Sequence, residues 1–235
     1  MPSSIVPEFV VEGSMFMIGR GAISEGSDLL ERTLPSKRGE PVWEVVYCFP
    51  RQGEWSEADY LAFETGNFPV ELVDGCLEFL PMPTPSHQRL SRYLVRRLED
   101  VVEAQSLGEV LSAPCPVRLW KGRVREPDVF FVRSERRVEA DKPPNGADLV
   151  IEIISPGPAN RERDLVKKRA DYARAGVAEY WIVDPEERRV TVLCLKGKNY
   201  RVHGEFAPGS TATSVLLPEF AIDVAEMFSS MLGTP

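Results

Sequence analysis

The sequence has few of the residues that mark secreted or thiolate-based proteins. Its 235 residues include four cysteines, and none of them forms a C-x-x-C pair. No basic and apolar leader with a cleavage-site pattern opens the chain, so we expect a reduced, cytoplasmic protein. No apolar run approaches the roughly 20 residues that a membrane-spanning helix requires, so we expect no membrane role.

Histidine is also scarce, since the chain contains two. A hydrolase that uses Ser155 or a cysteine as its nucleophile needs a general base beside that side chain. The sequence has neither a nucleophile-elbow pattern nor a histidine placed to serve one. This absence argues against nucleophilic hydrolysis.

The net charge of −8 argues at first against a nucleic-acid partner, because phosphate binding normally requires a basic surface. The acidity is concentrated in residues 1–85, which hold 14 acidic and 5 basic residues. Residues 86–235 are nearly neutral and carry basic clusters at 89–97 and 118–125. Such clusters are more often solvated surface than binding sites. The charge distribution therefore permits DNA binding without indicating it.

The distribution of apolar residues predicts one domain with an N-terminal extension. Residues 1–41 mix glycine, serine, proline and charge without a period, so we predict a loosely structured extension there and a compact domain over 42–235.

Within the domain we expect a β-rich segment at 41–47, a short helix capped by Ser56 with Asp59, and a hairpin that turns at Asp74-Gly75. Helical periodicity predicts long helices over about 84–107 and 161–175. Strands are predicted over 109–120, 126–133, 148–154, 179–184 and 190–195. This αβββαββ order predicts an α/β (α+β) fold with helices flanking a largely buried mixed sheet.

Two of the predicted strands carry carboxylates that are costly to bury. Asp128 opens the apolar run 129–132, and Glu152 interrupts the run 149–154. Side-chain alternation places Asp148 on the same side as Glu152. If the two strands are neighbours, facing carboxylates about 5 Å apart at Cβ can bind one divalent ion. Asp128 and Glu152 would then be co-ligands.

The second helix could bring a base to these acids. At about 100° per residue, Lys168 lies at the edge of the apolar face and Lys167 points away from it. Lys168 can therefore reach the acids while its stem stays packed, whereas Lys167 should lie in solvent. His87 and Glu71 are weaker candidates, because a histidine near a helix start is usually a packed or capping group and a hairpin glutamate is usually at the surface.

The motifs of the chain, in order, resemble the Uma family of restriction-endonuclease-like proteins in the PD-(D/E)xK nuclease superfamily. The similar segments cover about residues 55–225 and are 71–75, 83–88, 126–132, 148–156, 163–177 and 179–185. The resemblance implies that Asp128 and Glu152 bind Mg²⁺ or Mn²⁺. The superfamily has a lysine two positions after the glutamate, but Ile154 stands there, and the resemblance suggests Lys168 as the migrated catalytic lysine.

Two functions remain open from the sequence. The first is a metal-dependent DNA endonuclease that hydrolyses phosphodiester bonds with an ion-activated water and works as a homodimer. The second is an inactive descendant of that fold that binds nucleic acid or a protein. Retention of Asp128, Glu152 and Lys168 together favours the first, because a decayed site should lose a costly buried Glu152 early.

Overall fold

The chain divides into two compact units, residues 1–51 and 52–235. The computed structural model describes residue 38 and residues 43–63, 68–136 and 139–232. In the first unit, Trp43–Cys48 form a 3-10 helix, so the predicted β-rich segment at 41–47 is wrong over 43–47, and residues 41–42 lie outside the described residues. The side chains of 45–47 are exposed, and β-propensity takes effect only where side chains pack against neighbouring strands. The extension predicted over 1–41 lies, apart from residue 38, outside the described residues and stays a prediction.

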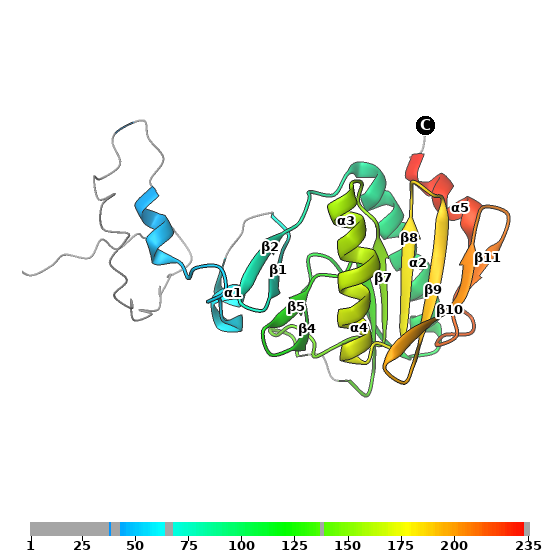
Figure 1. The fold of residues 1–235 in the computed structure, drawn as a ribbon. Helices are drawn as coiled ribbons and strands as arrows, with labels where there is room; N and C mark the ends of the chain where they lie inside the picture. The colour runs from blue at the N-terminus through cyan, green and yellow to red at the C-terminus, as the bar shows by residue number, and fades with distance from the viewer. Residues whose placement is uncertain (1–37, 39–42, 64–67, 137–138, 233–235) are drawn as a thin grey trace, which may run out of the picture. The chain divides into compact units, whose positions relative to one another are not determined.

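The second unit is built on a six-stranded mixed sheet (Figure 1). Its strand order is β10-β9-β8-β7-β6-β3, and only β7 and β8 pair in parallel. The strands are β3 (Gly108–Ser112), β6 (Val129–Arg133), β7 (Leu149–Ile153), β8 (Glu179–Asp184), β9 (Arg189–Lys196) and β10 (Asn199–Phe206). A parallel pair needs a long crossover, and a helical segment between β7 and β8 supplies it.

Helices cover both faces of this sheet, which confirms the predicted fold class (Figure 1). One face packs against α2 (Pro85–Ala104) and α5 (Val224–Ser229). The other packs against the crossover, which consists of α3 (Pro158–Glu162), a π-helical turn (Arg163–Lys168) and α4 (Arg169–Ala175). Neighbouring residues alternate between the two cores, with Phe131 on the α2 side and Phe130 on the α4 side. Across the described ranges, no helix is long and apolar enough to cross a bilayer.

A smaller antiparallel sheet combines the hairpin that precedes α2 with two strands that lie between β3 and β6 in the chain. Its order is β2-β1-β5-β4, and its strands are β1 (Val70–Val73), β2 (Cys76–Phe79), β4 (Val117–Trp120) and β5 (Arg123–Arg125). The strand predicted over 109–120 is therefore two strands in different sheets. Pro114 and Pro116 separate them, because proline cannot donate to a strand ladder. The chain returns from β5 to β6 through Glu126 and Pro127 and arrives at Asp128.

Further elements complete the unit without having been predicted. They are β5, β10, α5 and a two-stranded sheet of β11 (Thr211–Thr213) and β12 (Ala221–Asp223). The local signals near the start of the unit are confirmed. Ser56 and Asp59 form a capping box on α1 (Glu57–Ala62). Asp74 and Gly75 have φ of 49° and 79°, as a two-residue type I′ hairpin requires.

We expect Gly75→Ala to lower the free energy of unfolding by about 2–3 kcal/mol. A Cβ at this position would lie 2.4 Å from the carbonyl oxygen of Gly53, and the positive φ adds strain. Gly122→Ala is the matched control, because Gly122 has φ of +81° and nothing within 4 Å of its Cβ position. It should cost about 1 kcal/mol. Equal losses of the two variants in denaturant unfolding would show that the approach of Gly53 has no effect.

Candidate active site

A pocket lies beside the ends of β6 and β7, where α2 begins and the crossover helix passes. Its apolar lining includes Pro69, Pro81 and Pro83. Four carboxylates and three basic groups form most of the polar lining: Glu126, Asp128, Glu152, Asp164, His87, Arg163 and Lys168. The pocket therefore gathers acids from the link that leads into β6, from β7 and from the π-helical turn, and bases from α2 and the same turn.

Asp128 directly precedes β6, and Glu152 lies in the neighbouring strand β7. Val129 pairs with Ile151 in the antiparallel ladder, so the register continued by one residue sets Asp128 opposite Glu152. Oδ2 of Asp128 accepts a hydrogen bond from the Ile153 N–H at 2.7 Å, and Nε2 of His87 lies 3.3 Å from Oδ1. The structure thus brings Asp128, Glu152 and His87 to one pocket.

Lys168 lies directly against Glu152. Its Nζ is 2.8 Å from Glu152 Oε1, and the hydroxyl of Tyr172 donates to the same oxygen at 2.5 Å. Burial raises the pKa of Glu152 above its ordinary value even with the ammonium beside it, and the nearby Asp128 carboxylate adds to the shift. Burial alone lowers the pKa of Lys168, but the Glu152 carboxylate and its acidic neighbours hold it above the ordinary value. Lys168 therefore stays protonated.

The π-helical turn explains how a helix brings lysine to this point. Asp164, Lys168 and Tyr172 follow one another at intervals of four residues, and all three are buried. A π-helical turn has i→i+5 hydrogen bonds and is wider than an α-helical turn, so side chains four residues apart come closer to one line. Lys168, predicted at the edge of the apolar face, lies fully inside it, and Lys167 is exposed as predicted.

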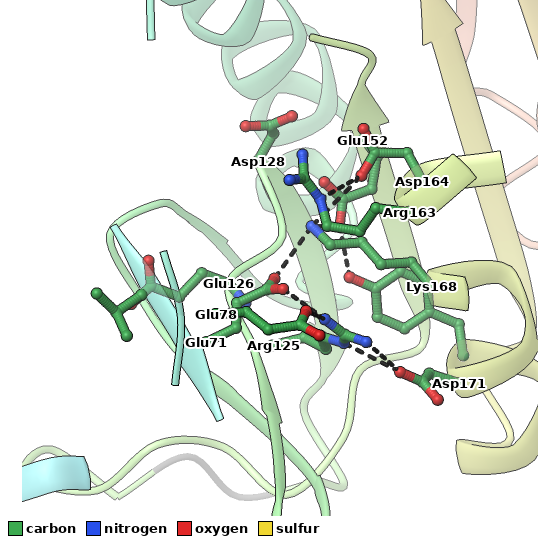
Figure 2. Close-up of polar contacts among 12 residues, drawn as sticks. Glu71, Glu78, Arg125, Glu126, Asp128, Glu152, Arg163, Asp164, Lys168 and Asp171 are labelled. Carbon is green, nitrogen blue, oxygen red and sulfur yellow. Dashed lines mark hydrogen bonds and ion pairs between the residues drawn. The ribbon is translucent and has the colours of Figure 1, made fainter. Parts of the chain in front are cut away.

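A buried arginine joins the pocket to the smaller sheet (Figure 2). Arg125 Nη1 donates to Glu71 Oε2 at 2.6 Å and to Glu78 Oε2 at 3.0 Å. Its Nε and Nη2 donate to Asp171 Oδ2 on α4 at 3.0 and 2.7 Å. The guanidinium therefore connects both strands of the hairpin to the crossover helix.

Glu71 lies between Arg125 and Lys168, and its side chain is fully buried. Lys168 Nζ is 3.1 Å from Glu71 Oε1. Burial raises the pKa of Glu71, but the charges of Lys168 and Arg125 outweigh burial and hold it below the ordinary value. The default assignment of Glu71 to the surface is wrong. β1 is an inner strand of its sheet, so neighbouring strands cover it. The order of the strands in that sheet cannot be read from the sequence.

Asp148 is not brought to the pocket. Its Oδ2 accepts a hydrogen bond from the Arg133 N–H at 2.9 Å and lies 3.4 Å from Arg136 Nε. Asp148 shares a strand side with Glu152, but it lies four positions earlier in the chain, which is about 13 Å along a strand. Side-chain alternation gave the side correctly and could not give the distance.

Glu126 lines the pocket although the sequence did not single it out. Tyr60 donates to its Oε1 at 3.3 Å, while its Oε2 is buried and has no hydrogen-bond partner within the part of the chain that the structure describes. Burial raises the pKa of Glu126 to about 7, and the Glu71 charge adds to the effect. The available signal was its position two residues before Asp128, in the link that returns to the large sheet.

The donor set fits a divalent cation. The described residues contain no cluster of three or more histidine, cysteine, aspartate or glutamate side chains that forms a complete metal site. Mg²⁺ is commonly held by one or two carboxylates, with water and substrate oxygens completing its shell. Burial raises the pKa of Glu152, so its negative charge is costly without a cation beside it, and Oε2 of Glu126 has no hydrogen-bond partner among the described residues. A hydrated cation in the pocket would relieve both. Of the lining carboxylates, Asp128 and Glu152 are the pair that the strand register sets opposite each other and that could hold such an ion.

Comparisons with known proteins identify a family and a shared fold. Residues 57–225 match the model of the Uma2 family, described as "Putative restriction endonuclease". The chain is also similar to a solved structure described as a "putative nuclease belonging to DUF820 from Anabaena variabilis ATCC 29413", with a TM-score of 0.61 and 20% identity. The alignment covers 75% of this chain and 98% of that one, and at this identity it shows a shared fold. No curated protein matches the chain.

Proposed function

Because this chain belongs to the Uma2 family, we propose that it is a metal-dependent endonuclease that hydrolyses phosphodiester bonds in DNA. One observation carries the proposal: Asp128 and Glu152 stand opposite each other at a pocket, with a protonated Lys168 bound to Glu152. Two carboxylates and a lysine side chain are the groups that a metal-dependent phosphodiesterase of this kind needs.

Under this proposal the residues of the pocket have different roles. Asp128 and Glu152 would hold Mg²⁺ or Mn²⁺, which when bound supplies an activated water and stabilises charge on the phosphate. The His87 ring and the Ile153 N–H fix the orientation of Asp128. Lys168 and Tyr172 fix Oε1 of Glu152, and the ammonium favours the ionised carboxylate that a cation requires.

We expect supercoiled DNA to be nicked in the presence of Mg²⁺ or Mn²⁺, with complete loss of cleavage on chelation and recovery when the ion is restored. Calorimetry should show Mn²⁺ binding that weakens more than tenfold in Asp128→Asn, because one of the two carboxylate ligands is removed. Cleavage that continues in excess chelator, or Mn²⁺ binding that Asp128→Asn leaves unchanged, would contradict the proposal.

A homodimer would place one pocket on each strand of a duplex, and we propose this arrangement for double-strand cleavage. Sedimentation of the protein with and without DNA tests it.

The second candidate function is an inactive nucleic-acid-binding or protein-interaction module. The observation that favours this alternative is Ile154, which removes the strand-borne lysine and leaves a lysine enclosed by acids. DNA binding without cleavage by any metal-loaded sample would select it.

A further inference from the structure

Lys168 is poorly placed to meet a substrate. Its side chain is 2% exposed, and its Nζ lies 2.8 Å from Glu152, 3.1 Å from Glu71 and 3.9 Å from Asp164. An ammonium has three N–H donors, and these carboxylates surround it. A phosphate that enters the pocket therefore gains little from Lys168, while the four carboxylates of the lining repel it.

Arg163 is the other strong base of the pocket, and it is held in a fixed position. Its Nε donates to Asp164 Oδ1 at 3.1 Å and its Nη1 donates to Asn160 Oδ1 at 3.0 Å. The amide of Asn160 is itself fixed, because its Nδ2 donates to the Pro156 carbonyl at 2.6 Å. The guanidinium is thus oriented before any ligand arrives.

One nitrogen of this guanidinium remains available. Within the described residues, Nη2 of Arg163 has no hydrogen-bond partner, and the side chain is 14% exposed, against 2% for Lys168. Figure 2 shows the guanidinium extending from the π-helical turn toward Asp128, on the same side as Glu152. It therefore lies beside the two proposed metal ligands and can donate to an anion that also meets the cation.

We infer that Arg163 binds a nonbridging oxygen of the nucleic-acid phosphate under attack, while Lys168 acts through Glu152 as a positioning residue. This inference rests on the proposed endonuclease function. A guanidinium matches phosphate oxygens with directed N–H donors, and two of its nitrogens are already fixed by Asn160 and Asp164. Donors that are oriented in advance act most strongly where negative charge develops on the phosphate.

Arg163→Ala should lower kcat for plasmid cleavage by about a hundredfold to a thousandfold at saturating Mn²⁺. Arg163→Lys should lie between this variant and the wild type, because lysine keeps the charge without the planar fork. A low, non-denaturing concentration of guanidinium chloride should restore part of the activity of Arg163→Ala. Calorimetric Mn²⁺ affinity should stay within about threefold, because both proposed ligands remain.

Arg161→Ala is the matched control on the same helical segment. Arg161 pairs with Asp184 and Glu186 rather than entering the pocket, so its removal should leave cleavage near the wild-type rate with no gain from guanidinium. Wild-type cleavage by Arg163→Ala would overturn the inference. A loss that extra Mn²⁺ fully reverses would also overturn it, because Arg163 would then act only on the metal site.

A binding measurement separates this inference from the proposed function. In a Glu152→Gln background, fluorescence anisotropy should show that adding Arg163→Ala weakens duplex DNA binding at least tenfold, about the discrimination expected of one charged contact. Equal affinities would overturn the phosphate contact. A wild-type protein that binds DNA through Arg163 but never cleaves it would refute the endonuclease function and support the contact.

Discussion

Replacing Glu152 by glutamine should reduce the rate of DNA cleavage about a thousandfold, equivalent to about 4 kcal/mol of transition-state stabilisation. Glutamine keeps the shape of the side chain and an acceptor oxygen for Lys168 and Tyr172. It removes the negative charge that a divalent cation requires. Initial rates of plasmid nicking at several Mn²⁺ concentrations, with Mn²⁺ calorimetry on the same sample, measure the effect.

Asp148→Asn provides the matched control for this experiment. Asp148 precedes β7, on the same strand side as Glu152, but it binds the Arg133 N–H and lies outside the pocket. Its replacement should leave the cleavage rate within about twofold, because neither Asp148 nor its partners Arg133 and Arg136 line the pocket. If both variants lose activity equally, Glu152 has no special role and the cation site must be placed elsewhere.

The sequence predicted those parts of the fold that short-range chemistry determines. The capping box at Ser56, the hairpin at Asp74-Gly75 and α2 depend on residues that are close in the chain. The division of 109–120 between two sheets depends instead on which distant strands lie beside each half of this segment. Pro114 and Pro116 already indicated a break between the halves. β10 was not predicted because it is an edge strand with mostly exposed side chains, so its pattern of apolar residues is weak.

For the candidate site, too, short-range patterns predicted correctly and contacts between distant segments were missed. Side-chain alternation indicated the sides of Asp128 and Glu152, and helical periodicity separated Lys168 from Lys167. Neither could show that Lys168 is enclosed by acids, because Glu71 reaches it from a different sheet. Arg163 escaped notice for a related reason. An arginine beside an acid on a helix is ordinary in a sequence, and only the π-helical turn places it in the pocket.

The enclosure of Lys168 also changes how Ile154 is interpreted. A lysine two residues after Glu152 would share its strand face, whereas Lys168 comes from the helix that packs on that face. The π-helical turn and Glu71 together hold the Lys168 ammonium against Glu152. Lys168 therefore supplies the positive charge of the missing strand lysine, but it does not supply contact with a substrate. Under the proposed function a second basic side chain must then contact the phosphate, and Arg163 lines the pocket beside Asp128 and Glu152.

Arg125→Met should lower the free energy of unfolding by about 3–5 kcal/mol, which is a large share of the stability of a typical domain. Arg125 is 1% exposed and is the partner of Glu71, Glu78 and Asp171. Methionine fills similar space, so the main cost is a buried Glu71 charge that has lost one of its two cations. Denaturant unfolding followed by circular dichroism measures the loss.

Arg123→Met is the control in the same strand. Arg123 pairs with Asp74, whose side chain is 70% exposed, and its Nη1 lies 3.4 Å from Asp171 Oδ2. Water can replace Arg123 at Asp74, and Asp171 keeps Arg125 as a partner, so the cost should be about 1 kcal/mol. A loss as large as that of Arg125→Met would mean that packing of the arginine stem, rather than an uncompensated buried charge, determines both results.

The double variant Arg125→Met with Glu71→Gln isolates the charge itself. Each single change removes one side of the 2.6 Å pair, and the second change removes the uncompensated carboxylate that the first leaves buried. The double variant should therefore be more stable than the sum of the single losses predicts, by about 2 kcal/mol. Lys168 limits the recovery, because Glu71→Gln also withdraws one of its carboxylate partners. Strict additivity would contradict a coupled network, and Arg125 and Lys168 would then be held independently of each other.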